Sequence, residues 1–331
     1  MPSLSDPLQA GSLNLRNRIV MPPMATGLSN QRGEATARLI KHYTDRSEEL
    51  GLLMVEHSYV SPEGRIGVNQ LGAHSDSLIP GLRRLVEAVH EKDTPIALQI
   101  NHAGGVTTQE ACGVQPVAPS PVIHPTRGQE LPRPLSVEEV EGIIRAFRDA
   151  ARRAEIAGFD AVEVHGAHGF LLGQFLSPLT NRRDDEFGGP LENRIRLSLR
   201  IIDEIRDDLG SDFPILYRIG AEDMLPGGLT LRDGVEAAKM IADRGVNIMD
   251  VSGGLVGSRP EGLTGPGYFV PQAAAIKDAV EIPVIGVGGI KTAEEADSII
   301  RSGKVDLVAI GRAALEDPKW SSKAIRSLRD K

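Results

Sequence analysis

The sequence predicts an α/β fold closed into a TIM (β/α)8 barrel. Eight short apolar runs alternate with longer amphipathic segments along the 331 residues, and no linker or low-complexity tract separates them. Glycine, histidine, proline or arginine follows each apolar run. This favours a barrel with functional loops around one face over the alternative, an open doubly wound sheet. We therefore expect one domain that spans residues 1–331.

The predicted strands are short and mostly aliphatic. They cover residues 18–21, 51–56, 94–100, 161–164, 213–219, 247–252, 282–287 and 305–310. Helical periodicity lies between them at 82–90, 136–157, 230–244 and 292–302. Ser136 with Glu139 indicates a capping box, and Thr230 and Thr292 are expected N-cap residues. Strands that alternate with helices predict parallel pairing with right-handed crossovers.

Composition and charge exclude several classes of function. The formal net charge of -8 argues against nucleic-acid binding. No run reaches the ~18 apolar residues of a membrane span. Cys112 is the only cysteine, and we expect it to be an unreactive bystander. The first residues lack the features of a signal peptide, so we expect a cytoplasmic protein that acts on a small molecule. Whether it forms a homo-oligomer stays open.

Two histidines follow the fourth predicted strand. His165 and His168 stand at its carboxyl end, before an unusually long loop, and barrel enzymes build their sites at this end of the strands. Two imidazole N–H groups can hold a substrate oxygen that becomes negative during reaction. The alternatives are a hydrogen-bonded pair of core histidines, or a hydrolase metal site that also uses His57 and His102.

Glycine-rich turns follow the last two predicted strands. Gly288-Gly289 and Gly311-Arg312 occupy the positions where barrel enzymes bind phosphate groups. Glycine lets the backbone approach an anion closely, and an arginine can bind it through two hydrogen bonds. Two such turns favour a phosphorylated cofactor or substrate over simple tight turns.

Two further polar residues lie late in predicted strands. Gln99 belongs to the third strand and Arg218 to the fifth, and we expect Arg218 to point into the barrel mouth. It could contact a cofactor or form an ion pair with Glu56 or Asp250, and the pattern favours neither. The charged run at 182–186 is interpreted as a solvated loop.

The chain resembles the Old Yellow Enzyme family of FMN-dependent NAD(P)H:flavin oxidoreductases, many of which are ene-reductases. The main resemblance is HGAHGFLLGQFLSPLTNRRDDEFGGPLENR at 165–194. Further matches follow in order over nearly the whole chain: NRIVM at 17–21, Pro23-Met24, Gln99 with HAG at 102–104, Gly288-Gly289 and Gly311-Arg312. The paired histidines resemble the bacterial branch of the family.

The resemblance implies a TIM barrel with FMN bound non-covalently at its mouth and NADH or NADPH as electron donor. It implies that His165 and His168 bind the substrate oxygen and catalyse, with Phe170 and Tyr268 also at the substrate. The residues implied for FMN are Pro23, Met24, Ala25, His57, Gln99, Arg218, Gly288, Gly289, Gly311 and Arg312. No metal is implied.

Phe170 departs from the family pattern. The family usually has a tyrosine there, which protonates the substrate, and phenylalanine has no proton to give. We therefore expect hydride transfer to an activated alkene, with weak alkene reduction. The alternatives are a flavin-linked dehydrogenase or demethylase of a small organic substrate, a metal-dependent barrel hydrolase, and a flavin-binding module without activity.

Overall fold

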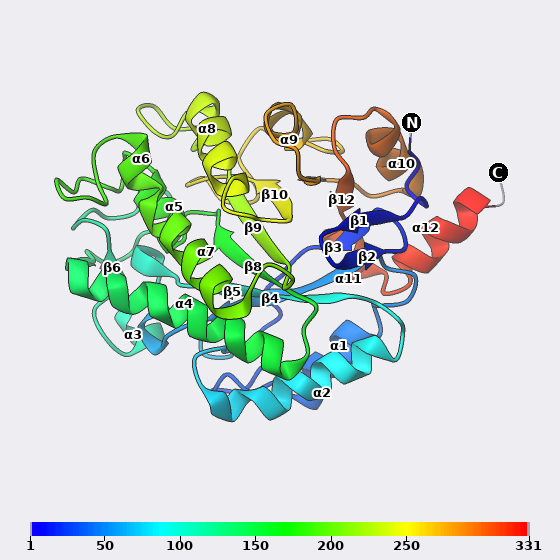
Figure 1. Cartoon of the computed structure of the whole chain (residues 1–331), viewed down its shortest axis with the longest axis horizontal. Coiled ribbons are helices and arrows are strands. Elements are labelled where there is room, and N and C mark those ends of the chain that lie inside the picture. The colour runs from blue at the N-terminus through cyan, green and yellow to red at the C-terminus, as the bar shows by residue number, and fades with distance from the viewer. Residues whose placement is uncertain (1, 330–331) are drawn as a thin grey trace.

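The computed structural model describes residues 2–329 and contains a closed barrel of eight parallel strands (Figure 1). Around the barrel the strands are β3 (Ile19–Met21), β4 (Leu52–Tyr59), β5 (Ile96–Asn101), β8 (Ala161–Gly166), β9 (Ile215–Gly220), β10 (Ile248–Ser252), β11 (Val284–Val287) and β12 (Leu307–Ala309). Strand β12 pairs with β3 and closes the ring. The predicted TIM barrel is confirmed, and the open sheet is wrong.

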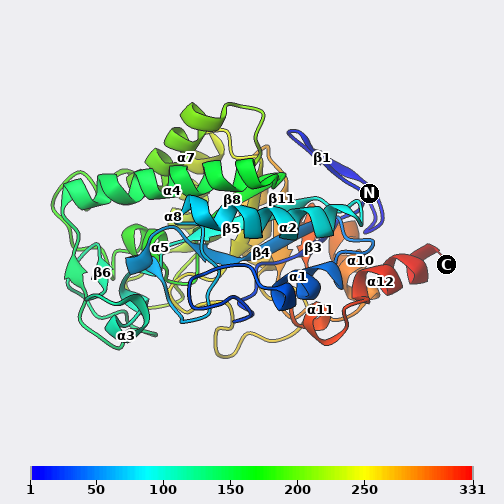
Figure 2. The same cartoon turned by 90° about the horizontal axis from the view of Figure 1, so that it is seen from below.

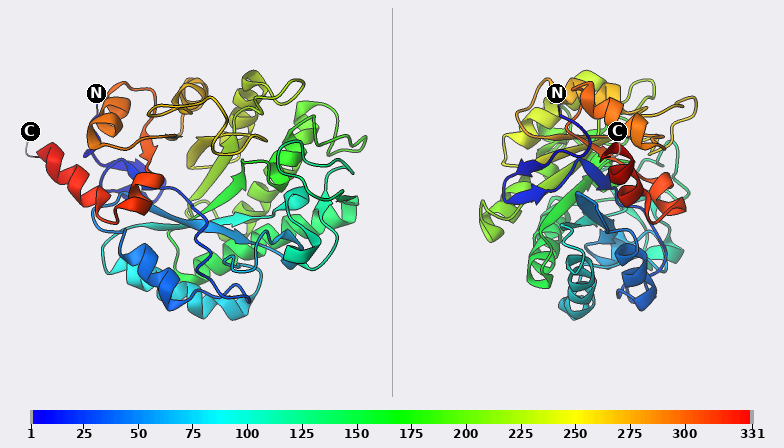
Figure 3. Two further views of the ribbon diagram at one scale, coloured as in Figure 1. Left: turned by 180° about the vertical axis from the view of Figure 1, so that it is seen from behind. Right: turned by 90° about the vertical axis from the view of Figure 1, so that its right-hand side faces the viewer.

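Helices form an outer layer around the strands (Figure 3). They are α1 (Ala37–Thr44), α2 (Ile79–His90), α4 (Val137–Ala157), α7 (Arg196–Leu209), α8 (Leu231–Ala242), α9 (Val270–Lys277), α10 (Ala293–Arg301), α11 (Arg312–Glu316) and α12 (Trp320–Arg329). The predicted capping box of Ser136 and Glu139 begins α4, and Thr230 and Thr292 begin α8 and α10 in the same way.

Shorter elements lie in the connecting loops. They are α3 (Gln109–Cys112), α5 (Leu171–Leu176), α6 (Leu191–Arg194), the 3-10 turns η1 (Pro62–Gly64), η2 (Asp76–Leu78) and η3 (Gly104–Val106), and the strands β6 (Val117–Ala118) and β7 (Arg133–Pro134). Figures 1 and 2 show α3 and β6 on the opposite side of the molecule from β1. These loops enlarge the carboxyl end of the barrel, where its site is expected.

A hairpin covers the other end of the barrel. Strands β1 (Leu8–Ala10) and β2 (Leu13–Leu15) pair antiparallel, and Ala10, Leu13 and Leu15 are buried against the first inward-facing residues of the barrel strands. This hairpin was not among the predicted elements. The larger core lies between the outer barrel surface and the helices.

Two local predictions need correction. Strand β4 continues past His57 to Tyr59, and its pairing with β5 shifts register between Val55 and Ser58, so His57 lies in an irregular part of the strand rather than after it. The run at 182–186 is not simply a solvated loop. The Arg183 side chain is 8% exposed, pairs with Asp185 and donates to the carbonyls of Pro119 and Leu135. Arg183 anchors the loop because its N–H groups donate hydrogen bonds to backbone oxygens that are far away along the sequence.

Candidate active site

One cavity of about 940 Å³ occupies the carboxyl end of the barrel. Its walls include most of the predicted site residues: Pro23, Met24, Ala25, His57, His168, Phe170, Arg218, Tyr268, Gly288, Gly289, Gly311 and Arg312. Gln99 and His165 do not line it, and each is 1% exposed behind the wall. A volume of this size suits a cofactor together with a small substrate, since ligand sites measure roughly 300–1,000 Å³.

The turn of Gly288 and Gly289 has a backbone conformation that favours glycine. Gly288 has φ +123° and Gly289 has φ +63°. A Cβ atom at Gly288 would lie 2.7 Å from the ring of Tyr268, so a side chain there has neither space nor a favourable conformation. Within residues 2–329, neither glycine N–H donates to a protein acceptor. Arg312 lines the same cavity and begins α11. These groups form a set of donors without acceptors.

Tyr268 lies at this glycine turn. Its ring is close to Gly288 and Gly289, and its hydroxyl donates to the carbonyl oxygen of Ser258 over 2.8 Å. Tyr268 lines the cavity, and its contact with the substrate stays a prediction. The turn before α9 folds back over Gly288, and the Gly267 and Tyr268 N–H groups donate to the Gly288 carbonyl oxygen.

His165 and His168 lie together, as predicted, but they are not equivalent. Their rings meet edge to face with centroids 5.1 Å apart. His168 lines the cavity, and its Nε2 lies 2.8 Å from Ser252 Oγ. Burial, then the charges of Arg218 and Arg127, hold the pKa of His168 well below its usual value. Burial likewise lowers the pKa of His165. Both imidazoles are therefore neutral at pH 7, and each has one N–H to donate.

Arg218 forms the ion pair that was one of the two alternatives for it. It lines the cavity, and its Nε lies 3.2 Å from Asp250 Oδ2, so the ion pair with Asp250 is confirmed. Gln99 donates to Glu163 over 2.7 Å within the same buried group. Burial, then the negative Asp250, raise the pKa of Glu163 well above its usual value, so Glu163 is the protonated acid. Arg218 therefore contacts Asp250 on one side and lines the cavity on the other.

Glu56 has a different role from the one considered for it. It accepts hydrogen bonds from the backbone N–H and hydroxyl of Thr26, and burial raises its pKa to about 7. These bonds fix the segment that carries Pro23, Met24 and Ala25 along the cavity wall. His57 also faces the cavity, and its Nδ1 lies 2.7 Å from the amide nitrogen of Gln70.

Ser252 and Arg127 are polar wall residues that were not predicted from the sequence. Ser252 contacts His168, and its place at the end of a predicted strand could have identified it. Arg127 belongs to the loop between β6 and β7 and lines the cavity beside Phe170, with its guanidinium carbon 5.0 Å from the ring centroid. Neither periodicity nor a motif marks Arg127. Phe170 itself is buried and contacts the His165 ring, with centroids 4.9 Å apart.

The residues from 2 to 329 include no group of three histidine, cysteine, aspartate or glutamate side chains arranged to hold a metal ion. In the same part of the chain, no helix combines the length and apolar character that crossing a membrane requires.

Comparison with known proteins decides the family. The model of the NADH:flavin oxidoreductase / NADH oxidase family matches residues 3–331. This chain belongs to that family. Its members are FMN-dependent enzymes that take electrons from NADH or NADPH, and the predicted relationship to Old Yellow Enzyme is thereby confirmed.

Relatives of two lengths share the barrel. The chain is 45% identical over 330 residues to an NADH oxidase of Thermoanaerobacter brockii. This match covers 98% of the chain and 50% of the relative. It is 40% identical over 314 residues to an NADPH dehydrogenase of Clostridium acetobutylicum, with 94% and 91% coverage. The chain thus spans about half the length of the first relative and most of the second.

Solved structures agree with the family assignment. A 2-naphthoyl-CoA reductase in complex with 2-naphthoyl-CoA has a TM-score of 0.94 at 26% identity, covering 98% of this chain and 52% of that one. An Old Yellow Enzyme homologue from Zymomonas mobilis has a TM-score of 0.87 at 27% identity, with 98% and 93% coverage.

The family's cofactor suits the donors of this cavity. FMN carries a phosphate at one end and a ring with carbonyl oxygens and ring nitrogens at the other. The turn of Gly288 and Gly289 offers backbone N–H groups without acceptors, and the Arg218 guanidinium faces the same space. Backbone donors and arginines are the groups that bind phosphate and a negative ring edge. The residues present therefore fit FMN.

Proposed function

We propose that this chain is the catalytic barrel of an FMN-dependent NAD(P)H oxidoreductase that passes hydride to an activated alkene, such as an enone, or to a related electrophile. The observation that carries the proposal is that one cavity joins free backbone donors, an arginine and a neutral histidine. We propose further that the FMN-binding barrel is a single domain spanning residues 1–331.

A bound FMN would supply hydride transfer from the nucleotide to the substrate. The residues that would hold it, in this proposal, fall into two groups. Pro23, Met24, Ala25, His57, Gln99 and Arg218 serve the ring, and Gly288, Gly289, Gly311 and Arg312 serve the phosphate. Arg218 stabilises negative charge on the ring because Asp250 keeps its guanidinium in place.

His168 would bind the substrate directly. Its ring is on the cavity wall and neutral, so its N–H can donate to a carbonyl or nitro oxygen that gains negative charge. His165 is the proposed second donor. Because it lies behind the wall, it needs a small side-chain movement to reach the substrate, and otherwise supports the His168 ring.

Phe170 supports a second candidate function. Its ring lies beside His165 where an acid would protonate the substrate carbon, and it has no acidic proton. Oxidation of a small organic substrate by flavin, as in a dehydrogenase or demethylase, does not require a proton donor at that position. Slow alkene reduction with fast substrate oxidation would favour this candidate.

The test is an anaerobic absorption spectrum of the purified protein before and after adding NADH or NADPH. We expect bound FMN, bleaching by nucleotide, and recovery of the oxidised spectrum when 2-cyclohexen-1-one is added. Absence of FMN after incubation with it would overturn the proposal, as would flavin that neither nucleotide reduces. Bleaching without recovery by any enone would leave the oxidation reactions as the better candidate.

A variant pair tests the role of His168. His168→Ala should slow reoxidation by the enone about 100-fold, because loss of one donor to a developing oxyanion costs about 2.7–4 kcal/mol. His90→Ala is the matched control, since His90 is an exposed histidine that contacts Asp160 on the outside of the barrel. Equal rates in the two variants would remove His168 from the proposed machinery.

A further inference from the structure

Arg127 is a partly buried cation without a carboxylate partner. Its Nη1 donates to the backbone carbonyl oxygen of His168 over 2.7 Å. A guanidinium has five N–H donors, and within residues 2–329 this is the one hydrogen bond that the Arg127 guanidinium makes to protein. No aspartate or glutamate oxygen in that part of the chain lies within 4.0 Å of it. Burial lowers its pKa, and no neighbouring acid opposes this effect.

Two other buried arginines of the protein have a carboxylate partner. Arg218 pairs with Asp250, and Arg183 pairs with Asp185 and two carbonyl oxygens. An arginine taken out of water normally has such partners, because an uncompensated buried charge is unfavourable. The remaining donors of Arg127 are therefore available to a bound molecule.

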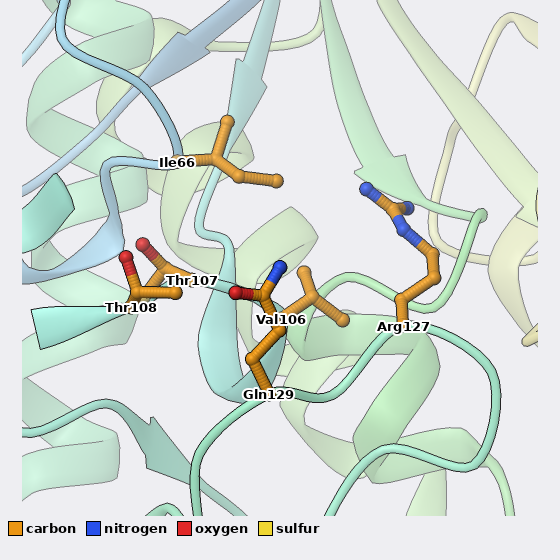
Figure 4. A pocket seen from close by; sticks show the side chains of 6 residues that line it. All are labelled: Ile66, Val106, Thr107, Thr108, Arg127 and Gln129. Atoms are coloured by element: carbon orange, nitrogen blue, oxygen red, sulfur yellow. The ribbon is translucent and has the colours of Figure 1, made fainter. Parts of the chain in front are cut away.

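Arg127 lines two cavities, and these indicate where such a molecule would bind. Arg127 lines the main cavity beside His168 and Phe170, and it also lines a second cavity of about 470 Å³. Figure 4 shows Arg127 and Gln129 on one loop facing the same space as Ile66. Ile66 and Val106 give this second cavity an apolar wall, and Ile66 packs against the cluster that includes Phe170. Arg127 thus stands where the two cavities meet.

We propose that Arg127 is a specificity-determining residue that binds an oxyanion, a carboxylate or phosphate, carried by the electron-accepting substrate. The inference rests on the proposed function, because the substrate is taken to bind at His168. The reacting group lies over His168 and Phe170, the anionic group meets Arg127, and an apolar part extends toward Ile66 and Val106. The phosphate of the nicotinamide nucleotide is the competing source of an oxyanion.

A purely structural role for Arg127 makes a different prediction. Its bond to the His168 carbonyl oxygen helps to hold His168 at φ +57°, an unusual backbone conformation for a side-chain-bearing residue. If that bond were the whole function of Arg127, replacing Arg127 would slow the reduction of all electron acceptors equally. If Arg127 instead recognises the charge of the substrate, its loss slows the reduction only of electron acceptors that carry an anionic group.

The experiment compares one acceptor with and without its charge. The holoenzyme is given 4-oxo-4-phenylbut-2-enoate and its methyl ester, which share the same enone and differ in the charge of the carboxyl group; the wild-type ratio of the two rates is the reference for the difference in intrinsic reactivity. Hydride adds to one alkene carbon and a solvent proton to the other, while NAD(P)H is oxidised. In Arg127→Gln, the acid-to-ester ratio of kcat/KM should fall about 10- to 100-fold, the range for a hydrogen bond to a charged group. Arg127→Lys should retain part of the preference.

Arg232→Gln is the matched control, because it removes the same charge from an exposed arginine of α8. Binding is measured separately by calorimetry of the oxidised holoenzyme with the saturated acid, 4-oxo-4-phenylbutanoate, and its methyl ester. This readout needs no turnover. FMN content and the flavin spectrum of each variant show that the site is assembled.

The outcomes are distinct. An acid preference that disappears in Arg127→Gln in both measurements supports the inference. An equal loss for acid and ester, or an effect confined to the affinity for NADH or NADPH, overturns it. Wild-type protein that reduces neither probe contradicts the proposed function, and the calorimetric preference then still decides the inference. Wild-type protein that reduces the probes but binds the saturated acid no better than its ester contradicts the inference alone.

Discussion

Nε of Arg218 lies 3.2 Å from Oδ2 of Asp250, and strands β9 and β10 place these residues directly opposite each other. Their side chains are 5% and 0% exposed. The pair forms because both residues point into the barrel at the same level, just below the cavity. Asp250 thus holds the Arg218 side chain below the cavity.

Asp250→Asn should destabilise the protein strongly. Removing one member of a buried ion pair leaves the other charge uncompensated, which costs about 3–5 kcal/mol of unfolding free energy. Urea denaturation of the variant and of Asp243→Asn measures the effect, since Asp243 is an exposed aspartate at the end of α8. A loss no greater than that of the control would contradict a stabilising role for the pair.

Phe170→Tyr should accelerate enone reduction by up to about 100-fold if the missing acid limits the rate, since general acids contribute typically 10²–10⁴-fold. The new hydroxyl would point from a ring that already contacts His165 and lines the cavity. The rate of flavin reduction by nucleotide serves as the internal control. Unchanged enone turnover with normal flavin reduction would show that proton supply is not the limit.

Gly288→Ala should weaken FMN binding at least about tenfold, because loss of one backbone bond to a charged group corresponds to ~1.5–3 kcal/mol. The added Cβ atom would meet the Tyr268 ring at 2.7 Å and displace the turn. Gly303→Ala is a matched control, since Gly303 also has a positive φ, +74°, with open space around it. FMN affinity is read from flavin fluorescence. Equal affinity in both variants would mean that the turn does not hold FMN.

Acid should destabilise the fold partly through His42. Burial, then the charge of Arg46, lower the pKa of His42 to about 4. The unfolded chain, with a pKa near 6.5, therefore binds more protons between pH 4 and 6.5, and stability falls as the pH drops through this window. His42→Gln should reduce the stability lost between pH 7 and pH 5 by about 1 kcal/mol, a value discounted for partial exposure. Urea denaturation at both pH values checks this, and an unchanged loss would contradict it.

The barrel could be predicted because its signals are local. Each strand is a short apolar run, and each of the α4, α8 and α10 helices begins at a side chain that caps it. The pairing of Arg218 with Asp250 stayed open in the sequence because it depends on strand register. The β1–β2 hairpin was missed because three-residue strands carry too little pattern.

The site was only partly predictable, for a related reason. Residues at strand ends were found because the barrel fixes where strands end, and His168, Arg218 and the glycine turns are of this kind. Arg127 was missed because an irregular loop carries it to the cavity. Arg183 was misread because neighbouring charges in sequence suggested solvent, whereas its partners Pro119 and Leu135 are far away along the chain.

The hairpin of β1 and β2 has a kinetic consequence. Ala10, Leu13 and Leu15 pack against the inward-facing residues of the barrel strands and extend the packed core at its amino-terminal end, so the cavity lies at the carboxyl end alone. We therefore expect nucleotide and electron acceptor to occupy this one cavity in turn. Double-reciprocal plots at several acceptor concentrations should be parallel lines, and excess acceptor should inhibit by competing with NAD(P)H for that cavity.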